Sequence, residues 1–101
     1  MKESRDLMPQ VNECEADECA FNEEGTCHAI AINVGGPDDP CPGCDTFLQS
    51  GVKGGVQSIV GGVGACKMQS CSFNDLLECN ASSVTIKLHE HHPDCATFQA
   101  V

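Results

Sequence analysis

Two short segments of the chain place large apolar residues at every second position. The first carries Ile30, Ile32 and Val34, and the second carries Val84, Ile86 and Leu88. Alternation with a period of two is typical of a strand that buries one face. The pattern therefore predicts one half-buried strand near residues 30–34 and another near residues 84–88.

A turn is expected shortly before each of these strands. Residues 22–26 contain Asn22 and Gly25, whereas the corresponding residues 74–78 keep Asn74 but have no glycine. An Asn side chain can bond its own backbone two residues on, and a Gly can adopt a positive φ. We therefore expect the Asn to be the shared element of the turn and the Gly to be dispensable.

Both strands belong to an internal repeat, in which six residues recur 52 positions later and a four-residue segment recurs 51 positions later. The matches are Cys14/Cys66, Cys19/Cys71, Phe21/Phe73, Asn22/Asn74, Cys27/Cys79, Ala29/Ala81 and the segments 44–47 and 95–98. Comparison of a sequence with itself selects the residues that the repeated unit requires. Eight of the nine cysteines meet this criterion. The ninth, Cys41, stands opposite His92.

The repeat predicts a flexible N-terminus over residues 1–10, a first four-cysteine unit over 11–48, a Gly-rich linker over 49–62 and a second unit over 63–101. The Val and Ile residues of the linker would also allow part of it to lie as a strand against one unit. A unit of roughly 40 residues cannot bury enough apolar surface to offset its chain entropy. We expect the cysteines to supply the missing stabilisation, and the four matched phenylalanines to form a miniature apolar core.

The composition is strongly acidic and narrows the choice of partners. Fifteen acidic residues against five basic ones give a formal charge of −10. Because phosphate binding needs clustered Lys and Arg, no nucleic-acid partner is expected, and a charged protein partner should be basic. No apolar run is long enough to span a bilayer, and residues 1–8 carry no export signal. We therefore expect no membrane association and a cytoplasmic location.

The matched cysteines indicate a metal site in each unit. Their spacing is Cys-x4-Cys-x7-Cys-x16-Cys in the first unit and Cys-x4-Cys-x7-Cys-x15-Cys in the second. Four thiolates can hold one zinc ion in a closed tetrahedron. The same spacing also suits two disulfides per unit, or a redox-active thiol. The predicted zinc ligands are Cys14, Cys19, Cys27 and Cys44 in the first unit and Cys66, Cys71, Cys79 and Cys95 in the second.

Two further residues are alternative ligands. Cys41 forms the only Cys-x-x-Cys motif, with Cys44, and its thiol is either spare or an alternative to Cys44. His92 belongs to a histidine-rich stretch, with His89 and His91, that could replace a thiolate or hold a second metal. We interpret this stretch as a solvated loop, because the first unit has no matching histidines.

The motif Cys-x4-Cys-x-Phe-Asn-x4-Cys-x-Ala, followed by an alternating strand and Cys-x-Thr-Phe, resembles the bacterial domain of unknown function 1540. The resemblance covers both units and implies a metal-binding module of about 40 residues with four characteristic cysteines. It also implies a bacterial source, and it assigns no activity. Cys41 departs from the four-cysteine pattern.

These observations predict a small metal-bound or disulfide-rich protein. We expect two repeated mini-domains of short β-strands and irregular loops, with little helix. No activated nucleophile, acid/base pair or phosphate loop is found, so the protein is not expected to be an enzyme. Its expected role is that of a zinc-binding structural or interaction protein. The alternatives are an iron protein, or a metal-handling or electron-transfer protein, that uses the same thiolates, and a disulfide-stapled secreted module.

Overall fold

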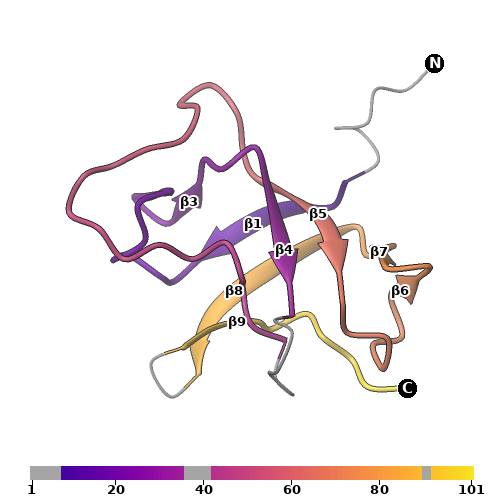
Figure 1. Ribbon diagram of the computed structural model, residues 1–101. Coiled ribbons are helices and arrows are strands. Elements are labelled where there is room, and N and C mark those ends of the chain that lie inside the picture. The colour runs from indigo at the N-terminus through magenta and orange to yellow at the C-terminus, as the bar shows by residue number, and fades with distance from the viewer. Residues whose placement is uncertain (1–7, 36–41, 90–91) are drawn as a thin grey trace.

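The computed structural model describes residues 8–35, 42–89 and 92–101, which fold into short strands joined by turns and loops (Figure 1). The strands are β1 (Gln10–Cys14), β2 (Asn22–Glu23), β3 (Thr26–Cys27), β4 (Ala31–Val34), β5 (Gly62–Cys66), β6 (Asn74–Asp75), β7 (Glu78–Cys79), β8 (Ser83–His89) and β9 (His92–Cys95). These described ranges contain no helix, and hence none that could cross a membrane. The predicted strand-and-loop protein with little helix is confirmed.

Five of the strands form one sheet in the order β4-β5-β1-β8-β9. β1 of the first unit lies parallel to β8 of the second, and β5 of the second unit lies parallel to β4 of the first. β1 and β5 meet antiparallel in the middle of the sheet, while β8 and β9 form an antiparallel hairpin at its edge. The two repeated units therefore share one sheet instead of forming separate mini-domains. The first unit contributes two strands to this sheet, β1 and β4, and the second contributes three, β5, β8 and β9. Two short strands would be too few for an independent sheet in the first unit.

The strand pairing follows an internal two-fold symmetry. Val11 stands opposite Val84 in the β1–β8 pair, and Val63 stands opposite Ile32 in the β5–β4 pair. Adding the repeat offset of 52 to residue 11 gives residue 63, and subtracting it from residue 84 gives residue 32. The repeat therefore converts the first pair into the second. The two halves of the chain thus make the same contacts with each other in both directions.

The segment 42–45 joins the two edges of the sheet. Val34 of β4 forms an antiparallel bridge with Cys44, and Gly43 forms another with Asp94 of β9. The backbone N–H of Cys44 also donates to the carbonyl oxygen of Pro93, at 2.8 Å. Because both edge strands find partners in this segment, the sheet closes on itself.

Two residue pairs lie on the axis of the two-fold symmetry. Gln10 pairs with Gly62, its own counterpart 52 positions later, in the middle of the sheet. Gly43 pairs with Asp94, its counterpart 51 positions later, where the sheet closes. The axis therefore crosses the closed sheet once at its centre and once at its closure.

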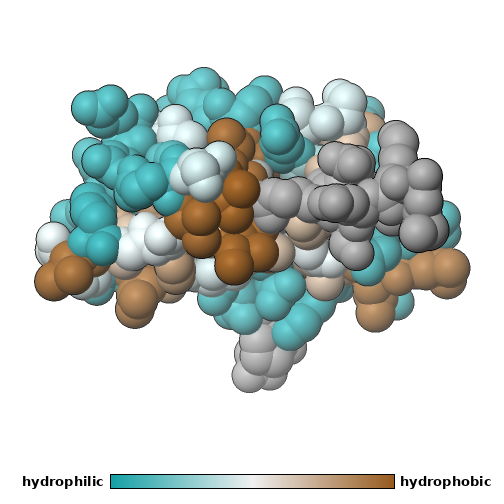
Figure 2. All heavy atoms as spheres, turned by 90° about the horizontal axis from the view of Figure 1, so that it is seen from above, coloured by the Kyte–Doolittle hydropathy of each residue, from teal (hydrophilic) through white to brown (hydrophobic). Residues whose placement is uncertain are grey.

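The core is built from the alternating positions of the strands. The largest fully buried side chains are Val11, Ile32, Val63, Val84 and Ile86. The two predicted strands are confirmed as β4 and β8, with Ile32 and Ile86 facing inward. The outer ends of the predicted alternation, Ile30 and Leu88, are exposed instead, because they lie beyond the buried part of the sheet. Viewed from above, much of the surface is hydrophilic, with hydrophobic residues exposed between (Figure 2).

Residues 49–62, which we call the connector, differ from the predicted flexible linker. Gly62 belongs to β5, and the N–H groups of Gly54, Val56 and Gly61 donate to carbonyl oxygens of the first unit at 2.7–2.9 Å. The prediction is corrected because glycine serves close approach here: a Cβ on Gly62 would lie 2.9 Å from the Cβ of Met8. The connector is therefore part of the folded body.

Candidate metal centres

A hairpin positions the first cysteines of each unit. In the first unit, the buried Asn22 side chain donates from Nδ2 to the carbonyl oxygen of Cys14 at 2.9 Å. Its Oδ1 accepts from the backbone N–H of Gly25 at 3.2 Å. Asn74 makes the same two bonds in the second unit, to Cys66 at 2.8 Å and from Leu77 at 3.1 Å. The predicted role of Asn as the shared turn element is confirmed.

The turn itself requires positive φ angles at two consecutive positions. The hairpin formed by β2 and β3 turns at Glu24 and Gly25, with φ of 55° and 83°. The hairpin formed by β6 and β7 turns at Leu76 and Leu77, with φ of 54° and 69°. Two consecutive positive φ angles in a two-residue loop match a type I′ turn, which favours Asn and Gly. The second unit makes the same turn without glycine, at the cost of strain in two leucines.

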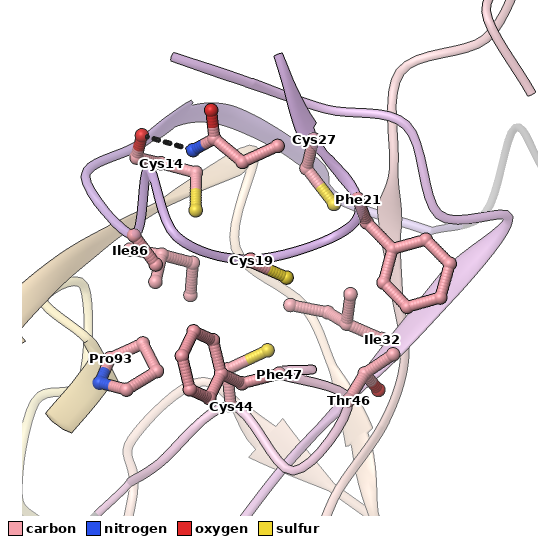
Figure 3. Close-up of a pocket in the computed structure, with 12 residues that line it drawn as sticks. Cys14, Cys19, Phe21, Cys27, Ile32, Cys44, Thr46, Phe47, Ile86 and Pro93 are labelled. Atoms are coloured by element: carbon pink, nitrogen blue, oxygen red, sulfur yellow. Dashed lines mark hydrogen bonds between the residues drawn. The ribbon is translucent and has the colours of Figure 1, made fainter. Parts of the chain in front are cut away.

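The four matched cysteines of the first unit line one cavity. Figure 3 shows the sulfur atoms of Cys14, Cys19, Cys27 and Cys44 pointing into a shared space. The cavity measures about 20 Å³, which is room for little more than one water-sized sphere. The first centre therefore comprises the four cysteines that the repeat selected.

The second unit repeats this arrangement in a cavity of about 10 Å³. Its sulfur-bearing lining residues are Cys66, Cys71, Cys79 and Cys95. Each cavity is also walled by the other unit: Ile86 of β8 lines the first, and its counterpart Val34 of β4 lines the second. The two centres are thus built jointly by the two halves of the chain.

The matched phenylalanines surround the same cavities. Phe21 and Phe47 line the first, and Phe73 and Phe98 line the second. All four are partly exposed, and Phe21 and Phe47 pack against the buried core. The prediction that the phenylalanines form the apolar core is therefore corrected: the buried core consists of Val, Ile, Ala and Cys side chains, and the phenylalanines line the cysteine cavities.

Backbone N–H groups donate to four of the sulfur atoms. The N–H of Ala29 donates to Cys27, and that of its counterpart Ala81 donates to Cys79. Thr46 donates in the same way to Cys44. Thr97 and Phe98 both donate to Cys95. Such donors stabilise a thiolate, and they are the kind of outer contact that accompanies metal-bound cysteines.

Burial opposes ionisation of these thiols. It raises the pKa of Cys44 to about 12, although the N–H of Thr46 opposes the shift. The neighbouring Cys14, Cys27 and Cys19 raise this pKa further through charge repulsion. Burial is also the main cause that raises the pKa values of Cys27, Cys79 and Cys95.

The donor set fits a small soft cation. Four sulfur atoms in an apolar cavity with room for one atom-sized guest match the ligands that zinc and iron prefer. A cation would also remove the cost of thiolate charges, which burial opposes. In the described ranges, the eight cysteines are all free thiols, and no three His, Cys, Asp or Glu side chains are already arranged to hold a metal ion. Binding would therefore have to draw the sulfurs inward.

The structure separates the candidate ligands. Cys44 lines the first cavity, whereas Cys41 lies outside the described residues. His92 is exposed at the start of β9, opposite His89, and lines neither of the two cysteine cavities. His91 lies outside the described residues. Each cavity therefore gathers the four cysteines predicted for its unit, and His92 is not among them.

Three kinds of group that help to build the cysteine cavities were not identified from the sequence. The cross-unit wall residues Ile86 and Val34 carry no local signal, because they become neighbours only through strand pairing. The N–H groups of the matched Ala and Thr residues act through the backbone. The Thr hydroxyl is a further case: Thr46 Oγ1 accepts from the backbone N–H of Asn33 at 3.1 Å, and Thr97 Oγ1 from that of Thr85 at 3.0 Å. Recurrence of the Thr in both units was the available signal.

Comparison with known proteins gives one match. The comparisons with curated proteins and with solved structures found no match. The family model of the Domain of Unknown Function DUF1540 matches residues 13–47 and again residues 65–98, which together cover more than half of the sequence. The two matched segments contain all eight cavity cysteines. The chain therefore belongs to the DUF1540 family and carries two copies of its domain in tandem.

Proposed function

We propose that this protein is a non-catalytic structural or interaction module that binds one zinc ion in each of its two four-cysteine centres. The observation that carries the proposal is the convergence of four sulfur atoms on each of two small apolar cavities. Tandem cysteine-rich DUF1540 domains support a metal-binding role in general. Zinc is the specific choice because four thiolates at about 2.3 Å satisfy its tetrahedral preference.

A centre closed by four thiolates favours a structural role. Zinc in such a site keeps no position for a water molecule, so it cannot generate the hydroxide that zinc hydrolases use. A structural zinc site contributes on the order of 10 kcal/mol to folding. That contribution suits a chain whose largest fully buried side chains, in the part that the structure describes, are Val and Ile.

The surface indicates the kind of partner. The formal charge of −10 repels phosphate backbones and favours a basic protein surface. We therefore propose a basic protein partner and no nucleic-acid partner. Long-range attraction of this kind weakens with ionic strength.

Elemental analysis of the protein purified under reducing conditions tests the proposal. We expect about two zinc ions per chain. Cys44→Ser should reduce the content to about one, and Cys41→Ser, as the matched control, should leave it at two. Iron in place of zinc would be detected by visible absorption, because zinc is colourless. Protein without metal, or with disulfide-bonded cysteines, would refute the proposal.

A further inference from the structure

The connector packs against the loop that holds Cys27 of the first centre. The N–H of Gly61 donates to the carbonyl oxygen of Cys27 at 2.7 Å, and the N–H of Val56 donates to that of His28 at 2.9 Å. The Nδ1 atom of His28 in turn lies 2.9 Å from the carbonyl oxygen of Ile59. The loop that holds Cys27 is therefore bonded to the connector at three points.

Glycine allows the connector to touch the sulfur itself. A Cβ atom at Gly61 would lie 2.7 Å from the Sγ of Cys27 and 3.0 Å from the carbonyl oxygen of Ala29. Real Cβ atoms do not approach other atoms so closely, so a larger residue would have to move away. The position of Gly61 therefore depends on its missing side chain.

The second centre has a proline at the matched position. The two-fold symmetry makes Pro9 the counterpart of Gly61: Val11 N–H donates to the oxygen of Gly61 at 2.8 Å, and Val63 N–H donates to that of Pro9 at 2.9 Å. Proline has no N–H, so it cannot make the bond that Gly61 makes to Cys27. It also carries a Cβ atom, so it cannot approach Cys79 as closely as Gly61 approaches Cys27.

The exposure of the matched cysteines agrees with this difference. Cys27 is 7% exposed and Ala29 is 3% exposed. Their counterparts Cys79 and Ala81 are both only half-buried. The third cysteine of the second centre is thus more exposed than that of the first.

We propose that the two metal centres are not equivalent: the first retains its ion under the connector, and the second exchanges its ion with thiol or chelating acceptors by way of Cys79. This inference rests on the proposed function and extends it from metal binding to metal exchange. Cys79 would be the sulfur that an incoming ligand replaces first, because Cys79 is more exposed than Cys27. An incoming thiolate would replace the Cys79 thiolate one for one, so the net charge of the four-thiolate set would not change.

Release kinetics of the zinc-loaded chain test this inference. A coloured chelator in excess, 4-(2-pyridylazo)resorcinol, should remove zinc in two phases of equal amplitude, with rates that differ at least about ten-fold. Cys79→Ser should abolish the fast phase, whereas the matched variant Cys27→Ser should abolish the slow phase. Pro9→Gly leaves all eight cysteines in place. It should slow the fast phase, because a glycine at this position lets the backbone approach Cys79 as closely as Gly61 approaches Cys27.

A second measurement does not depend on the variants folding. Brief treatment of the zinc-loaded wild-type chain with iodoacetamide, followed by peptide mass mapping, should modify Cys79 before Cys27. Two bound ions that leave in a single phase, with equal labelling of the two cysteines, would overturn this inference and leave the proposed function intact. Purified protein without metal would overturn both.

Discussion

Val11→Ala tests whether the two units fold as one body. Val11 lies on β1 of the first unit, is 1% exposed, and stands opposite Val84 of the second unit. Removing its two methyl carbons loses about 1.6 kcal/mol of transfer free energy, at about 0.8 kcal/mol per buried carbon. The cavity left behind adds up to about 1 kcal/mol, so the free energy of unfolding should fall by about 2–2.5 kcal/mol.

Urea unfolding of the metal-loaded protein, followed by far-ultraviolet circular dichroism and by metal release, measures this loss. We expect a single transition that shifts to lower urea with an unchanged slope, and both metal ions should leave within it. The cause is the shared sheet, in which Val11 supports a strand of the other unit.

Two control variants show whether the loss of stability has the expected cause. Val63→Ala changes the symmetry-related residue, which is also 1% exposed, and should cost the same free energy within error. Val52→Ala lies in the connector at 79% exposure and should change stability by less than about 0.5 kcal/mol. Two separate transitions, of which Val11→Ala moves only one, would show that the units fold independently and would refute the reasoning.

Three further predictions concern the turns and the thiols. Replacing Leu76 and Leu77 by Asn and Gly should raise the free energy of unfolding by about 2 kcal/mol, because both leucines hold a positive φ; an unchanged thermal midpoint would contradict this. Asn22→Ala should cost about 2–3 kcal/mol in chemical denaturation and Asn74→Ala about 1–2, because only Asn22 is fully buried; equal losses would count against the argument. Burial raises the pKa of Cys44 to about 12, so its thiol holds a proton at neutral pH and metal uptake must release it. Metal affinity should therefore rise with pH, and calorimetric titration in buffers of different ionisation enthalpy should detect proton release.

Local patterns predicted the parts of the structure that depend on neighbours in sequence. Alternation around Ile32 and Ile86 located two strands, because a pleated strand turns every second side chain to the core. The recurring Asn22 located the hairpin, because its side chain bonds within eight residues. Recurrence also selected the eight cysteines that line the cavities, whereas the alternative ligand His92 is exposed.

Long-range pairing could not be predicted in the same way. Alternation in β8 shows that one face is buried, but it does not show that β1, more than 70 residues earlier, is the neighbour. β5 was harder still, because the glycines at its start, including Gly62, favoured a linker. In the folded chain, Gly62 is required where β5 passes close to Met8. Glycine makes the backbone flexible in one setting and allows close packing of the backbone in another.

The two pairs on the symmetry axis, Gln10 with Gly62 and Gly43 with Asp94, have a consequence for how such a chain can evolve. Two identical chains joined by these contacts would form a homodimer whose stability depended on concentration. Fusion into one polypeptide removes that dependence, since the partner is always attached. It also frees each half to change alone, so a glycine can be kept at position 61 while a proline occupies position 9.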